Sequence, residues 1–262
     1  MFDRVEREHE TATRHLDPTA LSKLPQSQQL SELRNRIATI TSKVGGTESA
    51  AATVPSHDII AMPGALGELL PGGGLARGSI IACPRGSLVC ATLAAATTAG
   101  LNAAVVGGLR PSRVGLLAAW EMGARLSAIA AVDANASQAA DVIPVLLDGI
   151  PLVVLDVAGM RLRPTEEEAL RARVRSKKGI LLVTGGAWVR QPNLSISASP
   201  VGNTGIGHGR GRLREIELDM RVEVHGQLFR RGRVKLASAG NGRTHWVNPI
   251  AATPQIGLVR TG

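Results

Sequence analysis

The sequence predicts an α/β fold in which helices flank a mostly parallel sheet and an antiparallel hairpin follows at the C-terminal side. From Gly78 to Thr184, short apolar runs alternate with helical segments, which is typical of parallel strands covered on both faces. From Glu215 to Val224, apolar and charged residues alternate, which is typical of a half-buried antiparallel strand. Together these patterns predict one core that contains both kinds of strand.

The elements of this core follow one another in a regular order. The expected parallel strands are Ile80–Cys83, Ala103–Val106, Ile129–Val132, Leu152–Asp156 and Ile180–Thr184. The expected helices are Val89–Ala99, Ser112–Gly123, Ser137–Leu147 and one that opens with Thr165 as N-cap and Glu168 at the third helical position. The stretch Arg190–Leu213 is rich in Gly, Ser and Asn and is predicted to be a mobile basic loop, after which strands Ile216–Val224 and Arg231–Leu236 form the hairpin.

Three parts of the chain are expected. Residues 1–54 form a polar, partly disordered segment with a short amphipathic helix at 28–43, which either packs on the core or docks on a partner. Residues 55–238 form the core, and residues 239–262 form a C-terminal tail that resembles an extended docking peptide.

Composition narrows the function classes. The 262 residues are 44% hydrophobic, enough for a sizeable core, and no stretch resembles a signal peptide or a membrane span, so we expect a cytoplasmic protein. The two cysteines, Cys83 and Cys90, are too few for a disulfide framework or a metal cluster and are expected to be buried thiols. No metal site is predicted.

The positive charge lies in the second half of the chain. Residues 1–156 hold 12 Lys and Arg against 14 Asp and Glu, whereas residues 157–262 hold 18 against 7. This half is therefore the candidate surface for DNA or an acidic partner, with a merely solvated basic surface as the alternative. Because the chain has only two Phe, three Trp and no Tyr, binding of single strands by base stacking is not expected. The candidate binding residues are Arg210, Arg212, Arg214, Arg230, Arg231, Arg233 and Lys235.

A degenerate phosphate-binding loop follows the first parallel strand. Such a loop needs glycines, a Lys for the β- and γ-phosphates and a hydroxyl for Mg²⁺. The loop Pro84, Arg85, Gly86, Ser87 has one glycine and no Lys, while Asp156 stands at the end of an apolar strand, where a Mg²⁺-binding carboxylate would lie. We therefore expect neither ATP nor Mg²⁺ as a cofactor and no enzymatic activity.

These residues give the chain a family resemblance. Leu70–Gly78, Val153–Asp156 and the segment Gly205–Arg214 with its following hairpin resemble the RecA-like superfamily, and within it the ImuA group of actinobacterial accessory proteins. The resemblance covers residues 55–240 and implies a RecA-like core. It also implies a role in damage-induced (SOS) mutagenesis and DNA repair by translesion synthesis, beside an ImuB-type polymerase-like adaptor and a DnaE2-type polymerase. RecA, DNA and association with the nucleoid belong to the same implied setting.

Departures from RecA itself bear on the chemistry. The loop lacks its Lys, no catalytic Glu follows Ala103–Val106, and no N-terminal polymerisation region is recognisable. A non-catalytic interaction module is therefore the first hypothesis. Two alternatives stay open: an unconventional ATPase that uses Arg85 or Arg77 as the cation and Asp156 for Mg²⁺, and a cell-division inhibitor of the SulA type.

Overall fold

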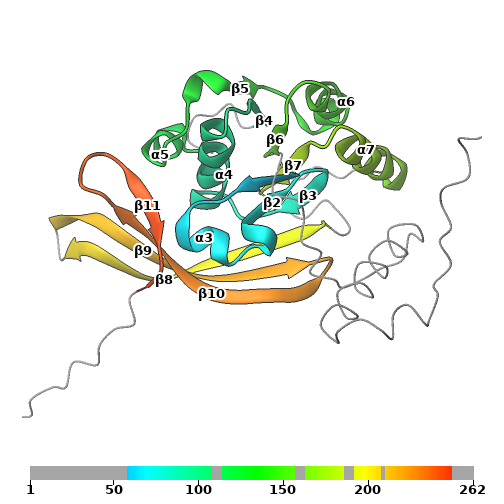
Figure 1. Cartoon of the computed structure of the whole chain (residues 1–262). Helices are drawn as coiled ribbons and strands as arrows, with labels where there is room; N and C mark the ends of the chain where they lie inside the picture. Colours follow the sequence, from blue (N-terminus) through cyan, green and yellow to red (C-terminus); the bar gives the residue numbers. More distant parts are fainter. Residues whose placement is uncertain (1–57, 108–113, 157–162, 186–191, 208–209, 250–262) are drawn as a thin grey trace, which may run out of the picture. The chain divides into compact units, whose positions relative to one another are not determined.

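The computed structural model describes residues 58–107, 114–156, 163–185, 192–207 and 210–249 (Figure 1). The chain divides into two units, 1–52 and 53–262, and every described residue belongs to the second. The expected helix at 28–43 and the segment 1–54 lie outside the described residues.

One sheet of nine strands organises the second unit. The five strands from its centre to one edge are parallel to one another, and the next strand toward the other edge is parallel to them. The last three strands on that side alternate in direction. The order across the sheet is β11 (Thr244–Val247), β10 (Gln227–Ser238), β9 (Arg210–Val224), β8 (Leu194–Gly207), β3 (Ser79–Ala82), β7 (Ile180–Val183), β6 (Leu152–Leu155), β4 (Ala103–Val106) and β5 (Ile129–Val132). The mostly parallel sheet and the C-terminal antiparallel hairpin predicted from sequence are confirmed.

Helices cover both faces of the parallel strands because those strands are apolar on both sides. In β6, Leu152 and Val154 face one hydrophobic cluster, while Val153 and Leu155 face the other. The first cluster is covered by α4 (Ser87–Thr98) and α5 (Leu116–Glu121), the second by α6 (Ala136–Leu147) and α7 (Pro164–Ser176). Figure 1 shows the two helix pairs on opposite sides of the sheet.

A glycine-rich turn leads into β3. A small antiparallel pair, β1 (Ile59–Ala61) and β2 (Gly74–Ala76), precedes it, with α3 (Gly64–Glu68) and the 3₁₀ turn η2 (Pro71–Gly73) between them. A Cβ on Gly74 would lie 2.2 Å from the carbonyl oxygen of Ile60, so this close strand approach requires glycine. A second 3₁₀ turn, η3 (Leu126–Ala128), precedes β5.

The predicted mobile loop Arg190–Leu213 is wrong for its described residues, which form β8 and the start of β9. Leu194 and Ile196 are buried and alternate with the serines at 195 and 197, so the segment has the period of a half-buried strand. The small polar residues of the segment make this alternation of buried and exposed positions hard to recognise in the sequence. Pairing with β9 along most of its length stabilises the strand.

The N-terminal cap of α7 is also different from the prediction. The helix begins at Pro164, and the side chain of Glu166 accepts a hydrogen bond of 2.8 Å from the backbone N–H of Arg163. Proline is favoured at the first helical position because its fixed φ suits the helix and its missing N–H has no intrahelical partner there. The helix therefore starts before Thr165.

The sheet also continues beyond residue 238, where the sequence predicts a tail. Thr244–Val247 forms β11 and pairs with β10, and Trp246 is buried in the larger hydrophobic cluster. None of the described helices is long and apolar enough to cross a membrane.

Candidate functional site

The degenerate loop lies at the carboxyl end of β3. Ser87 is the first residue of α4, and Gly86 is its N-cap with φ of +100°, a conformation that side chains rarely adopt. The loop is thus a strand-loop-helix turn whose backbone geometry matches the expectation, with Pro84 and Arg85 between the two elements. Ligands of open parallel sheets bind at this edge.

Arg85 and Asp156 form an ion pair across this edge. Asp156 follows β6 and is 1% exposed, and its Oδ1 accepts hydrogen bonds from Nε of Arg85 at 2.8 Å and from Nη2 at 2.5 Å. These hydrogen bonds raise the pKa of the Arg85 guanidinium. The two residues that sequence analysis placed in one site do meet, and they bind each other.

Gly185 and Thr184 complete the site, and sequence analysis did not assign them to it. A Cβ on Gly185, whose φ is +82°, would lie 2.2 Å from Nη2 of Arg85 and 2.7 Å from Oδ1 of Asp156. Only a glycine leaves room for the ion pair here. The hydroxyl of Thr184 and Oδ2 of Asp156 are buried and have no hydrogen-bond partner among the described residues. The sequence signal that could have identified this part of the site was Gly185, the glycine that follows β7.

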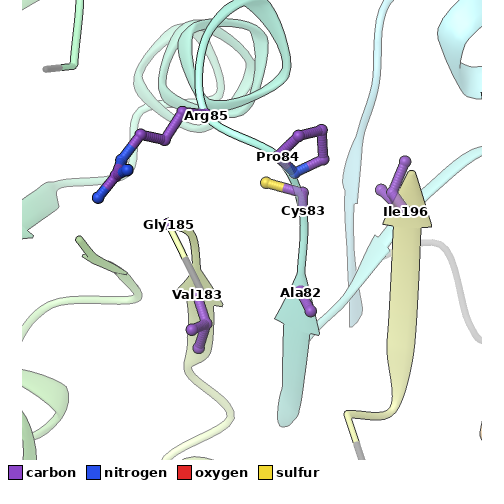
Figure 2. A pocket seen from close by; sticks show the side chains of 7 residues that line it. All are labelled: Ala82, Cys83, Pro84, Arg85, Val183, Gly185 and Ile196. Atoms are coloured by element: carbon purple, nitrogen blue, oxygen red, sulfur yellow. The ribbon is translucent and has the colours of Figure 1, made fainter. Parts of the chain in front are cut away.

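A cavity of about 460 Å³ opens beside the ion pair (Figure 2). The lining residues are Ala82, Cys83, Pro84, Arg85, Val183, Gly185 and Ile196. Arg85 is the one charged side chain among these described lining residues, and Figure 2 shows it reaching from the loop toward the end of β7 at Gly185. The side chains that line the cavity are therefore apolar apart from the Cys83 thiol and the Arg85 guanidinium, which Asp156 already binds.

Arg77 does not belong to this site. It precedes β3, at the amino end of the strand, and its Nε donates a hydrogen bond to the carbonyl oxygen of Lys178 at 3.0 Å. The four residues of β3 separate the two ends by about 13 Å. The hypothesis that Arg77 replaces the loop lysine is therefore wrong.

Both cysteines are buried free thiols, as the sequence predicts. Burial raises the pKa of the Cys83 thiol to about 12 and that of Cys90 to about 11. Neither thiol is a thiolate at neutral pH, so neither is activated as a nucleophile. Within the described part of the chain, no three His, Cys, Asp or Glu side chains cluster as a metal site would require.

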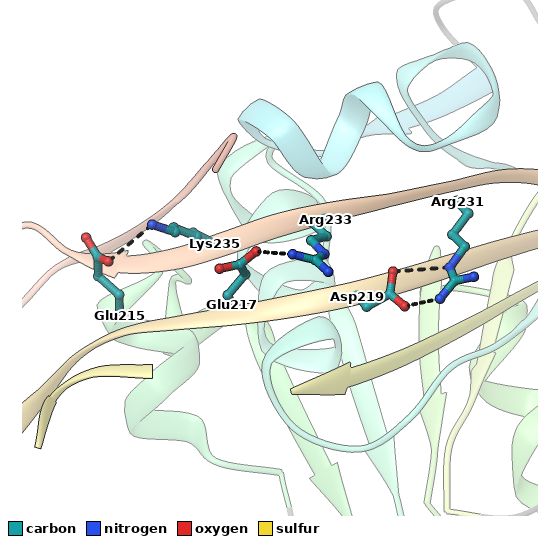
Figure 3. Close-up of polar contacts among 6 residues, drawn as sticks. All are labelled: Glu215, Glu217, Asp219, Arg231, Arg233 and Lys235. Carbon is teal, nitrogen blue, oxygen red and sulfur yellow. Dashed lines mark hydrogen bonds and ion pairs between the residues drawn. The ribbon is translucent and has the colours of Figure 1, made fainter. Parts of the chain in front are cut away.

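Most of the candidate basic residues on β10 are neutralised by β9. Figure 3 shows three ion pairs between the strands: Arg231 with Asp219 at 2.6 Å, Arg233 with Glu217 at 3.5 Å and Lys235 with Glu215 at 3.5 Å. The hydrogen bond between Arg231 and Asp219 raises the pKa of the guanidinium and lowers that of the carboxyl. These three ion pairs, which we call the charge ladder, leave this part of the sheet face without net charge.

The remaining candidates differ from this ladder. Arg230 donates a hydrogen bond to the carbonyl oxygen of Glu68 and lies 5.4 Å from the ring centroid of Phe229. Arg212 and Arg214 are exposed and form no ion pair with any residue that the structure describes. Arg210 begins β9, where its backbone is paired with Gly207. Among these candidates, Arg231, Arg233 and Lys235 are therefore paired with carboxylates, whereas Arg212 and Arg214 have no ion pair within the described structure.

The chain matches one family model and is similar to a mycobacterial protein. Residues 68–190 match the model of the MT3502 N-terminal domain, a segment that contains Arg85, Asp156 and Gly185 and ends before β8. The chain is also 39% identical over 163 residues to the uncharacterized protein Rv3395c of Mycobacterium tuberculosis. The similar region covers 62% of this chain and 72% of that protein.

Proposed function

The chain belongs to the family of the mycobacterial protein Rv3395c, and we propose that it is a non-catalytic binding protein: a RecA-like core in which an ion pair replaces nucleotide chemistry. The MT3502 N-terminal domain match includes both partners of that ion pair.

The contact between Arg85 and Asp156 carries this proposal. In a nucleotide site, the strand-end carboxylate holds Mg²⁺ and a loop cation contacts the phosphates. Here Oδ1 of the carboxylate accepts both hydrogen bonds from the loop cation, so the two groups neutralise each other. Binding of Mg²⁺ to Oδ1 would have to displace the Arg85 guanidinium from this buried carboxylate.

The loop composition supports the same conclusion. The chain has no Lys in the loop, apolar residues follow Ser87, and no Glu ends β4. Phosphoryl transfer depends on positioning and on electrostatic stabilisation, and each lost group of this kind lowers the rate by orders of magnitude. A core with an intact sheet and none of these groups is suited to binding.

The resemblance to the ImuA group supplies the proposed setting. We place the protein in the cytoplasm, in damage-induced translesion synthesis, where it would bind an ImuB-type adaptor in a complex with a DnaE2-type polymerase. RecA is a further proposed partner. The sheet order, with the loop after β3 and the acid after β6 at one edge, supports the RecA-like assignment.

A nucleotide-binding measurement tests the proposal that the loop neither binds nor hydrolyses ATP. Titration calorimetry of the full chain with ATP and Mg²⁺ should show no saturable binding up to about 1 mM, the concentration at which even weak specific sites begin to fill. Asp156→Asn is the matched variant. Saturable binding with ATP turnover that Asp156→Asn abolishes would establish the ATPase alternative.

A partner-binding measurement tests the proposed role beside an ImuB-type adaptor. The purified chain should form a complex with a purified ImuB-type adaptor in size-exclusion chromatography. Formation of a complex with a tubulin-like division protein and none with the adaptor would favour the SulA-type alternative.

A further inference from the structure

We infer that the paired ends of β8 and β9, residues 203–207 and 210–214, form an arm that binds the sugar-phosphate backbone of duplex DNA without sequence preference. This arm lies outside the segment that matches the family model.

The arm is a two-stranded ribbon. The first residue of β9 that pairs with β10 is Glu215, opposite Ala237, and β3 pairs with β8 only at Leu194 and Ser195. At the base of the arm, Asn203 and Thr204 pair with Ile216 and Glu215. Beyond them, β8 and β9 pair with each other alone among the described strands, through Ile206 with Gly211 and Gly207 with Arg210. Figure 1 shows these yellow strand ends reaching past the helices at the left of the view.

No side chain of the arm is buried among those described. Residues 203–206 and 211–214 are all exposed, so neither face of the ribbon packs on the core. A two-stranded ribbon with both faces in water is at best marginally stable by itself. An exposed ribbon of this kind has both faces free to contact a ligand.

Uncompensated positive charge gathers on the arm. Residues 203–214 contain three Arg and no Asp or Glu, and Arg212 and Arg214 have no ion pair within the described structure. The acids at the base of the arm, Glu215 and Glu217, are already paired with Lys235 and Arg233. The arm therefore presents cations alone, which complements a polyanion.

Duplex DNA fits this element better than a single strand. The major groove is about 12 Å wide and admits a two-stranded β-ribbon, and guanidinium groups bind phosphates through bidentate hydrogen bonds. Residues 194–214 contain no Phe, Trp or Tyr on which unpaired bases could stack. Ile206 and Leu213, 62% and 45% exposed, would contact deoxyribose, which carries no sequence information.

This inference deepens the proposed function, since it rests on the chain being a binding protein and names one ligand class. The proposed function and this inference can be refuted by different results. ATP turnover at the loop would refute the proposed function without affecting the arm, whereas loss of DNA binding by the arm leaves the adaptor complex intact.

Fluorescence anisotropy with a labelled 24-base-pair duplex of arbitrary sequence, across a salt series, tests the arm. The full-length double variant R212Q/R214Q should weaken binding at low salt about tenfold or more. It should also reduce the slope of log affinity against log salt by about 2, because each phosphate contact contributes about one unit. R163Q/R175Q removes the same charge from two exposed positions, the N-cap and the last turn of α7, and should leave the slope unchanged.

Three results would overturn the inference. One is an equal loss of duplex affinity in the arm and α7 variants. Another is tighter binding of the matching single strand than of the duplex. The third is an arm variant that binds duplex normally and loses the adaptor, which would make the arm a protein-docking element.

Discussion

At the scale of single residues, the role of the degenerate loop depends on which side chain contacts Asp156. A carboxylate that is 1% exposed needs a cationic or hydrogen-bonding partner, because burial of an unpaired charge is strongly unfavourable. Arg85 supplies that partner from a loop 71 residues away in sequence, and Gly185 leaves the space for it. The ion pair thus has a structural role that a nucleotide site would not require.

Replacement of Arg85 should therefore destabilise the fold. Arg85→Ala leaves a buried carboxylate without its partner and should lower the free energy of unfolding by roughly 2 kcal/mol in urea denaturation. The double variant R85A/D156N should lose less than R85A alone, because it removes both charges.

Arg77→Ala is the control for this measurement, since Arg77 is held by one hydrogen bond at the other end of β3. Equal losses for Arg85→Ala and Arg77→Ala, or a double variant less stable than R85A, would refute a structural role for the ion pair.

At the scale of secondary-structure elements, the start of α7 shows how neighbouring residues choose between two caps. Thr165 with Glu168 and Arg163 with Glu166 both have the spacing of a capping box. Pro164 decides between them, because proline suits the first helical turn, and the structure places it at the first helical position.

Because Glu166 and not Glu168 caps α7, substitution of these two glutamates should affect the stability unequally. Glu166→Ala removes the hydrogen bond to the Arg163 N–H and an acid at the helix start, and should lower the free energy of unfolding by about 1 kcal/mol. Glu168→Ala, two residues further into the helix, should cost less than about half of that. Thermal unfolding of both variants measures the difference, and a larger effect at Glu168 would restore the cap expected from sequence.

At the scale of the whole described unit, the parallel and antiparallel halves of the sheet share one hydrophobic core. The larger cluster joins Leu93 of α4 and Val154 of β6 to Met220 of β9 and Trp246 of β11. Because the same cluster contains both halves, they should unfold together in one cooperative transition.

Trp246 tests this coupling. Trp246→Ala empties a buried site beside α3 and should lower the free energy of unfolding by about 3 kcal/mol while the transition stays single. Trp246→Phe should cost less, since the indole N–H has no hydrogen-bond partner in the described structure. His245→Ala, at an exposed neighbouring position, is the control. Two separate transitions in Trp246→Ala would show that the halves are independent.

The sequence by itself determined the parallel strands, the helices between them and the buried thiols. Runs such as Leu152–Leu155 are apolar at every position, and burial on both faces follows from that local pattern. The strict alternation from Ile216 to Val224 likewise predicts a half-buried strand without knowledge of its partners.

Tertiary structure alone decided the features that depend on distant partners. Arg85 and Asp156 form an ion pair because two strand ends meet at one edge of the sheet, and residues 194–207 form a strand because β9 pairs with them. The same pairing divides the arginines, since Asp219 and Glu217 neutralise Arg231 and Arg233 while Arg212 and Arg214 lie beyond the end of β10. Contacts between residues far apart in sequence leave no local pattern, so only the folded chain shows which charges remain free to bind.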